Sequence, residues 1–344
     1  MTRESDASES DAPKRDAQSD ADSPSQIPEV PDAVETPILP GPGVFLWSAG
    51  SGSLADPLTL EGLAGVHPLW AEDARAFAPW QEVFAGGGAA GSQSWRRSGR
   101  HAGSRVVVCG PCSSSLDVAR RFVENDLLAP WDSALAVSQR SGRGQLGRSW
   151  SSPAGNIYGT LCLPPVPKEF DNILSLIMGY CLARFLRAKN VPACIKWPND
   201  ILVRDVKVAG VLIEEREGRC VAGMGLNLVS APAAGELRAD HGAPAGSLRE
   251  IAEFSGSPLG TWCDLVDFVR VCYENTIARE VGDVTARLIE PLLCWLGREV
   301  TIREAGEASG SGRILGLAKD GALRVMPCGK TREKRLTSGA VRRA

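Results

Sequence analysis

The order of its short apolar segments constrains the fold of this chain more than any other feature. Strand patterns are found at 105–108, 134–137, 156–163, 193–196, 210–214 and 220–228, and helical spacing at 115–125, 173–188 and 262–280. Strands and helices therefore do not alternate one for one along the chain. This mixed order favours an α+β fold over a strictly alternating parallel sheet. We expect the main domain to span 104–294.

The last fifty residues have a different character, with several short strand patterns in succession. Residues 298–303 alternate between apolar and polar side chains, and 334–336 adds a further short strand. Between them, 313–317 and 322–326 flank Lys319-Asp320-Gly321, a sequence typical of a hairpin turn. These strands predict a small β-barrel domain over 295–344.

The first hundred residues divide into two parts. Residues 1–40 carry ten acidic side chains against three basic ones and little apolar sequence, and so predict a disordered acidic tail. Residues 41–103 form an N-terminal extension and linker for which the sequence indicates no role. Large apolar side chains such as Trp47, Trp70 and Trp80 favour packing of part of this extension on the main domain.

Charge and apolar content restrict where the protein acts. The whole chain has a net charge of −3, and its acidic tail leaves a positive remainder that suits a phosphate-handling enzyme. No apolar stretch reaches the roughly 20 residues that a membrane helix needs, so no membrane contact is expected. We find no secretory signal pattern at the start. The irregularly spaced cysteines are expected to be reduced, as in a cytoplasmic protein.

A glycine- and arginine-rich loop at 139–150 is the first segment with a chemical signature. Its sequence, QRSGRGQLGRSW, lies between two predicted strands. Glycines let the backbone approach a ligand closely, and successive N–H groups can form an anion-binding nest. Arg143 and Arg148 add forked donors for phosphate or carboxylate. From the loop alone, an anion site and an ordinary basic surface loop are equally good interpretations.

A second signature, KWPND at 196–200, opens a predicted hairpin. Its two apolar strands, 201–203 and 207–215, are joined through a polar turn at 204–206. Lys207 opens the second strand, and Gly210 leaves room for a ligand beside it. A lone lysine at a hairpin end is usually only solvated, so the functional interpretation depends on the loop as well.

Together these segments resemble the biotin–protein ligase family, whose signatures are a GRGRxGR-type loop, KWPND and K-(L/V)-A-G-(I/V)-L. The chain carries GRGQLGRSW, KWPND and KVAGVLIEE in the family's order. GMGLNL at 223–228 matches the family's G-x-G-x-N strand, and GSLRE at 246–250 resembles its S-L-R-E segment. The resemblance runs from about residue 106 to the C-terminus. It implies the mixed sheet shared with class II aminoacyl-tRNA synthetases and a terminal SH3-like barrel.

The resemblance also implies an activity. Members of the family use ATP with Mg²⁺ to convert biotin into biotinyl-5'-AMP, and then transfer the biotin to a lysine of a carrier such as the biotin carboxyl carrier protein of acetyl-CoA carboxylase. We therefore expect ATP, Mg²⁺ and biotin as ligands and a carrier domain as partner. The sequence leaves open whether the chain is a monomer or a homodimer. Such a site needs fixed cations near the α-phosphate.

The matching positions give candidate site residues. Lys207, Arg143 and Lys196 are the catalytic candidates, with Lys207 as the cation that bridges biotin's carboxylate and the phosphate. Biotin and its adenylate are expected along Ser114, Ser115, Gln139, Gly142, Arg143, Gly144, Gln145, Lys207 and Gly210. The ATP and adenine candidates are Arg148, Trp150, Asn199 and Asn227, the last matching a residue that reads the adenine edge. For Asp200 three roles stay open: orienting the incoming lysine, holding a metal ion, or purely structural.

Two positions depart from the family pattern. Its biotin-binding S-T-N stands here as Ser114-Ser115-Leu116, and Leu116 cannot replace an asparagine amide. Gln145 stands where an arginine often follows Arg143-Gly144. The loss of that charge leads to the hypothesis that biotinyl-AMP leaves this protein faster.

Other functions fit the sequence less well. A lipoate-type acyl transferase or ligase of the same fold is the main alternative, but we expect it to lack this pairing of loop and KWPND. Cys109-Gly110-Pro111-Cys112, between a strand and a helix, allows a thiol redox site. A zinc site is disfavoured because there is no second CxxC and the three histidines are scattered. No DNA partner is expected, because 1–40 is acidic and 1–100 lacks a basic recognition helix.

Overall fold

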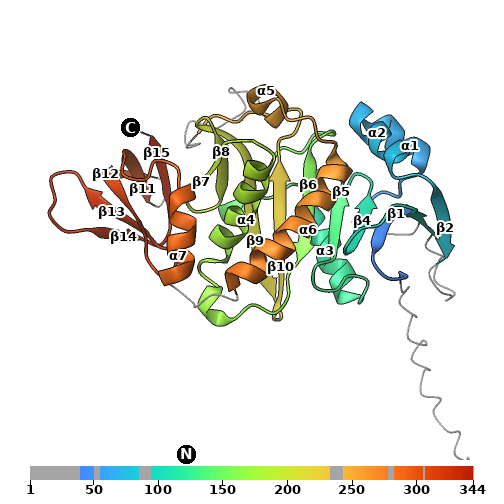
Figure 1. Cartoon of the computed structure of the whole chain (residues 1–344), viewed down its shortest axis with the longest axis horizontal. Coiled ribbons are helices and arrows are strands. Elements are labelled where there is room, and N and C mark those ends of the chain that lie inside the picture. The colour runs from blue at the N-terminus through green and yellow to red at the C-terminus, as the bar shows by residue number, and fades with distance from the viewer. Residues whose placement is uncertain are drawn as a thin grey trace, which may run out of the picture. The chain divides into compact units, whose positions relative to one another are not determined.

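The computed structural model in Figure 1 describes residues 39–49, 55–84, 94–232, 243–277, 283–304 and 307–343. The expected acidic tail lies outside these ranges except for its last two residues. The helices are α1 (Leu60–Val66), α2 (Pro68–Ala76), α3 (Ser115–Glu124), α4 (Leu174–Ala188), α5 (Leu248–Ala252), α6 (Pro258–Ile277) and α7 (Asp283–Ile289). Within the described residues, no helix combines the length and apolar character needed to cross a membrane.

The described strands form two separate sheets. One is mixed, in the order β2-β3-β1-β4-β5-β6-β10-β9-β8-β7, and the other has the order β14-β13-β12-β11-β15. The strands of the first are β1 (Gly43–Ala49), β2 (Trp80–Phe84), β3 (Ser94–Ser98), β4 (Arg105–Cys109), β5 (Ser133–Ala136), β6 (Ile157–Cys162), β7 (Ala193–Lys196), β8 (Asp200–Val203), β9 (Val206–Arg216) and β10 (Arg219–Leu226). Among the described strands, only β1–β4 and β4–β5 pair in parallel, so the α+β prediction is confirmed.

The N-terminal extension contributes three strands to the large sheet. Val44 of β1 pairs with Val106 of β4, and β3 continues the sheet on the other side of β1. The extension is also tied to the helical layer, because the buried Asp73 of α2 accepts hydrogen bonds from the backbone of Leu259 (2.8 Å) and Gly260 (3.1 Å) at the start of α6. The described part of the extension, 41–49, 55–84 and 94–103, thus shares a core with the rest of the sheet.

Glycines in the sheet allow helices to approach both of its faces. On one face, Leu116 of α3 lies against Gly223 of β10, where a Cβ atom would stand 3.0 Å from it. On the other, the indole of Trp262 in α6 lies where a Cβ of Gly159 would be, 2.4 Å away. Gly223 pairs with the residue next to Gly159, so the two glycines face opposite sides. The face under α3 is the one that carries the candidate site.

The C-terminal sheet follows the predicted strands and adds one. Its strands are β11 (Glu299–Glu304), β12 (Glu307–Leu317), β13 (Leu323–Pro327), β14 (Lys334–Leu336) and β15 (Ala340–Arg343). β12 and β13 form the expected hairpin, while β15, which has no strong sequence pattern, pairs with β11. A five-stranded antiparallel sheet of this size is consistent with an SH3-like domain.

A disulfide joins the segment before the C-terminal sheet to the edge strand of the large sheet. Cys194 of β7 is bonded to Cys294, with their Cα atoms 5.3 Å apart. Nearby, the Trp197 indole donates a 3.0 Å hydrogen bond to the carbonyl of Gly321. The expectation that all cysteines are reduced is therefore wrong for this pair. The two cysteines are 100 residues apart in the sequence, so no local spacing pattern indicates this disulfide.

Candidate functional site

A β-bulge in β9 sets which side chains reach the site. Ile201 of β8 pairs with Ala209, and the next residue, Leu202, pairs with Lys207, so Val208 is the extra residue. The bulge changes the alternation of side chains along β9. As a result, Lys207 shares the site face of the sheet with Gly210 and Glu214.

Two lysines converge on one carboxylate at this face. Lys207 Nζ lies 2.6 Å from Asp200 Oδ1, and Lys196 Nζ lies 2.9 Å from Asp200 Oδ2. Burial raises the pKa of Asp200, but the positive charges of Lys207 and Lys196 outweigh it and lower the pKa to about 2. The Lys196 side chain is only 6% exposed, whereas that of Lys207 is 27% exposed. Of the two cations, Lys207 is the one a ligand can reach.

Trp150 covers a glycine floor beside Lys207. Gly210 of β9 and Gly225 of β10 are cross-strand partners, and Cβ atoms on them would lie 3.1 Å and 2.6 Å from the indole. Lys207 Nζ stands 5.0 Å from the centre of the same ring. The backbone N–H of Trp150 also donates a 2.8 Å hydrogen bond to the carbonyl of Gly142. Trp150 thus connects the lysine cluster to the glycine–arginine loop.

The loop itself is a tight backbone structure. Gly142 is buried, and a Cβ there would lie 2.5 Å from the carbonyl oxygen of Trp150, so only glycine fits. At the tip, Gly144 N–H donates to the carbonyl of Arg148 (2.7 Å), and Leu146 adopts a left-handed φ of 58°. Gln145 is half-buried, whereas Arg148 lies exposed on the outer arm of the loop.

Arg143 is held by two carboxylates on the inner arm of the loop. Its two terminal nitrogens donate to the two oxygens of Asp117 at 2.9 Å and 2.8 Å, and its Nε donates to Glu214 at 3.3 Å. Arg120 forms an ion pair with the same Glu214. The hydrogen bonds that Arg143 donates to Asp117 raise the pKa of Arg143 above its ordinary value. With a side chain 34% exposed, Arg143 remains accessible as a cation.

The polar residues expected at the biotin end come together beneath the loop. Gln139 Oε1 accepts hydrogen bonds from the backbone N–H of Ser115 (2.7 Å) and from Ser114 Oγ (3.4 Å). Gln139 Nε2 donates to Ser152 Oγ (2.8 Å), and Thr160 Oγ1 donates to Ser115 Oγ (2.9 Å). These residues thus form one connected polar network with donors and acceptors for a polar ring.

The remaining candidates occupy different positions around this centre. Asn199 Nδ2 donates to the carbonyl of Val211 (2.7 Å), which fixes the KWPND turn against β9. Asn227 follows β10, and its N–H donates to the carbonyl of Val208, next to Lys207. Leu116 is 3% exposed and packs into the core. The departure from the family's asparagine therefore places an apolar side chain in the core.

Sequence reasoning missed three groups that the structure brings into the site. Asp117 and Glu214 pair with Arg143, and Ser152 pairs with Gln139. Asn156 was also overlooked; its Oδ1 accepts hydrogen bonds from the backbone of Leu228 (2.8 Å) and the residue after it, just beyond Asn227. Glu214 belongs to the KVAGVLIEE motif. Because of the bulge in β9, however, the sequence does not indicate that its side chain lies on the same face of the sheet as Lys207.

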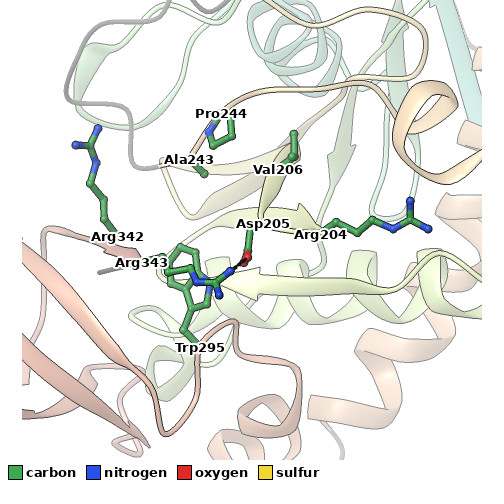
Figure 2. A pocket seen from close by; sticks show the side chains of 8 residues that line it. All are labelled: Arg204, Asp205, Val206, Ala243, Pro244, Trp295, Arg342 and Arg343. Carbon is green, nitrogen blue, oxygen red and sulfur yellow. Dashed lines mark hydrogen bonds and ion pairs between the residues drawn. The ribbon is translucent and has the colours of Figure 1, made fainter.

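A basic pocket of about 380 Å³ lies at the tip of the β8–β9 hairpin, next to the start of the C-terminal sheet. Asp205 accepts a 2.7 Å hydrogen bond from the Trp295 indole and forms an ion pair with Arg343. Figure 2 shows this pair at the centre of the pocket, while Arg342 and Arg204 extend away from it in different directions. No residue predicted for the site lines this pocket.

The structure does not favour the redox interpretation of CGPC. Cys109 and Cys112 are free thiols, and both are fully buried. The contact with Cys112 and burial hold the pKa of Cys109 well above its usual range, the reverse of a reactive thiolate. Within the described part of the chain, no group of three or more histidine, cysteine or acidic side chains could hold a metal ion.

The region that builds the site matches a known family. A model of the biotin/lipoate A/B protein ligase family matches residues 116–228. Those residues form a biotin/lipoate ligase-family domain. The domain contains the glycine–arginine loop, KWPND and the β9–β10 pair, so the resemblance predicted from these motifs is confirmed.

Individual relatives of this ligase-family domain bear biotin in their names. A biotin–[acetyl-CoA-carboxylase] ligase of Paracoccus denitrificans is 43% identical over 112 residues, which cover 30% of this chain and 47% of the relative. The bifunctional ligase/repressor BirA of Escherichia coli K12 is 36% identical over 106 residues, covering 28% of this chain and 33% of the relative. The chain thus aligns with less than half the length of these two curated relatives.

A solved structure matches a larger part of the chain than the family model does. The biotin protein ligase of Aquifex aeolicus, in complex with biotin and ATP, superposes with a TM-score of 0.58 at 23% identity. The match covers 70% of this chain and 99% of the Aquifex chain. At this identity the likeness establishes the fold, and it agrees with the mixed sheet and helices described above.

Proposed function

We propose that this protein is a biotin–protein ligase that uses ATP to form biotinyl-5'-AMP and transfers the biotin to a lysine of a carrier protein. The observation that carries the proposal is the convergence of Lys207, Lys196 and Asp200 beside the Arg143 loop, over a floor of glycines. The names of its biotin-ligase relatives support biotin as the substrate among the acids that such a site could activate.

The proposed reaction has two steps. A carboxylate oxygen of biotin attacks the α-phosphorus of ATP, and the bond to the β-phosphate breaks, so that pyrophosphate leaves with its electron pair. The amine of the carrier lysine then attacks the acyl carbon of the mixed anhydride, loses a proton, and expels AMP. Both steps place negative charge on oxygens near the α-phosphate, where fixed cations stabilise it.

Lys207 is the cation proposed to act on these oxygens. Its ammonium group is held by Asp200 on one side and by the Trp150 ring on the other, which fixes its position before the ligand arrives. Lys196 is buried, and its proposed role is to hold Asp200 in place. Asp200 is therefore a positioning residue for Lys207 in this proposal.

Biotin's ureido ring is proposed to bind in the network of Ser114, Ser115 and Gln139. These side chains provide hydroxyl and amide groups, which suit a ring that both donates and accepts hydrogen bonds. The Arg143 loop, with Gly142, Gly144 and Gln145, would then close over the adenylate. Gly210 is the proposed contact of the biotin chain on β9, and the Trp150 indole, which lies over it, would have to shift to admit the chain.

The nucleotide is proposed to lie on the other side of Lys207. Trp150 offers an aromatic face, and its buried Nε1 has no hydrogen-bond partner, so a shift of the ring toward a ligand breaks no bond there. Asn227 and exposed Arg148 remain the adenine and phosphate candidates. Mg²⁺ fits best on the phosphates of ATP, because both oxygens of Asp200 are already paired with lysines. When bound, the ion would neutralise charge on the leaving pyrophosphate.

The proposed protein partner is a biotin carboxyl carrier domain, and the proposed compartment is the cytoplasm, where ATP is available. A direct test incubates the protein with ATP, Mg²⁺, biotin and an apo carrier domain, and records the intact mass of the carrier. A parallel reaction replaces biotin with lipoate. Biotin on the carrier lysine supports the proposal. Transfer of lipoate without biotin would favour the lipoate-type ligase instead.

A further inference from the structure

Residues 55–56 of the N-terminal extension cross directly over the CGPC segment. Asp56 N–H donates a 2.9 Å hydrogen bond to the carbonyl of Pro111, and Gly110 N–H donates to the carbonyl of Asp56 at 3.2 Å. Ala55 forms an antiparallel bridge with Cys112. A Cβ on Gly110 would lie 2.5 Å from the Asp56 carbonyl oxygen, so this crossing requires glycine.

The same CGPC segment and Ser113 are also hydrogen-bonded to the backbone that enters the candidate site. On its far side, Cys112 forms a parallel bridge with Gln139, and Arg140 N–H donates to the carbonyl of Cys112 at 2.8 Å. Ser141 N–H donates to the carbonyl of Ser113 at 2.9 Å. Three backbone runs, 55–56, 110–113 and 139–141, are therefore hydrogen-bonded side by side, and the third begins the glycine–arginine loop.

A side-chain contact spans the three runs. Asp56 Oδ2 lies 2.8 Å from Arg140 Nη1. Both side chains are about half exposed, so this ion pair alone contributes little. The backbone of the first run is nevertheless fixed, because Leu58 is buried in the core and its N–H donates to the carbonyl of Trp47 in β1.

We propose that Asp56 and its neighbours are positioning residues for the biotin end of the site, so that the N-terminal extension is a working part of the catalytic unit. They act by holding the CGPC turn, which sets Ser114 and Ser115 against Gln139. In this proposal the CGPC motif acts through its backbone, which is hydrogen-bonded to residues 55–56 on one side and to 139–141 on the other. This inference rests on the proposed function, since it names biotin as the ligand at that end.

The test uses two kinds of change in the full chain. Gly110→Ala pushes the Asp56 carbonyl away from the turn, and Gly65→Ala, in α1 of the same extension, meets no atom within 4 Å and serves as its control. Asp56→Arg places like charges together at Arg140, and the exchanged pair Asp56→Arg with Arg140→Asp restores their attraction. Biotin affinity is measured by calorimetry, and KM for ATP by pyrophosphate release.

The proposal predicts that Gly110→Ala and Asp56→Arg weaken biotin binding, Gly110→Ala by about tenfold. KM for ATP should change by less than about twofold, Gly65→Ala should match the wild type, and the exchanged pair should recover biotin affinity relative to Asp56→Arg. If Gly110→Ala fails to fold, the charge exchange alone decides. Wild-type biotin affinity in the folded variants overturns this role while leaving the ligase proposal intact. Absence of biotin binding by the wild type overturns both.

Discussion

Arg143 and Asp117 form a forked ion pair, in which two guanidinium nitrogens donate to the two carboxylate oxygens at 2.9 Å and 2.8 Å. This geometry is the one an arginine uses to bind a phosphate or a ligand carboxylate. Under the proposed function, the adenylate would therefore compete with Asp117 for these donors. The pair holds the loop against α3.

Removal of this pair should loosen the loop. Asp117→Asn abolishes one charge and leaves Arg143 with Glu214 as its remaining carboxylate partner, which we expect to cost about 1 kcal/mol of loop-opening free energy. Hydrogen exchange of the amides at 142–149 should therefore become several-fold faster. Glu124→Gln, an exposed position at the end of the same helix, is the control and should leave exchange unchanged. Equal exchange in both variants would contradict the restraint.

The pKa of Asp200 leads to a pH-dependent prediction. Its pKa is about 2 in the folded protein and should be near the ordinary 3.8 when unfolded. A lowered folded pKa gives stability that is present above pH 3.8 and is lost as the pH falls towards 2. Asp200→Asn, which leaves buried Lys196 without its counter-ion, should cost roughly 3 kcal/mol at neutral pH. In urea titrations, the difference from wild type should shrink through this acid range; a constant difference would contradict the assignment.

Asp73 should act as a cap for α6. Its buried carboxylate accepts hydrogen bonds from Ser257 and from the N–H groups of Leu259 and Gly260, across 184 or more residues of chain. Asp73→Ala should lower the free energy of unfolding by about 1–2 kcal/mol in urea titrations. Neighbouring Glu72, which is exposed, is the matched control. A loss for Asp73→Ala no larger than that for Glu72→Ala would show that the cap contributes nothing.

Gln145 should control how long the adenylate stays bound. Under the proposed function, Gln145→Arg adds a cation to the loop beside Arg143 and should slow release of biotinyl-AMP from the protein, by about tenfold if one charge-assisted hydrogen bond forms. Release can be followed by trapping free biotinyl-AMP after a single turnover. Leu146→Arg, at the 84% exposed loop tip, tests whether any added charge suffices. Identical release from wild type and Gln145→Arg would reject the hypothesis.

Much of the fold could be predicted because its strands and helices follow simple periodicities. The strand at 105–109 and the helix at 174–188 lie where their apolar spacing indicates. The bulge at Lys207–Val208 could not be predicted, because the extra residue is defined only by its pairing with β8. The role of the extension was hidden for a similar reason: Gly110 is required by the Asp56 carbonyl, which lies 54 residues away in sequence.

For the site, motifs located the cations and Asp200, but not the carboxylates that pair with Arg143. Lys196, Lys207 and Arg143 stand in recognisable signatures, whereas Asp117 lies in an ordinary amphipathic helix and is brought to Arg143 by tertiary packing. The Cys194–Cys294 bond was missed because long sequence separation carries no spacing signal.

The most direct test of the central claim is single-turnover formation of biotinyl-AMP from biotin, ATP and Mg²⁺. The wild type should form the adenylate and release one pyrophosphate for each, while Lys207→Ala should be slower by about a hundredfold or more. Lys189→Ala, which removes an exposed lysine paired with Asp264, should behave as the wild type. No adenylate from the wild type, or an undiminished rate in Lys207→Ala, would contradict the account.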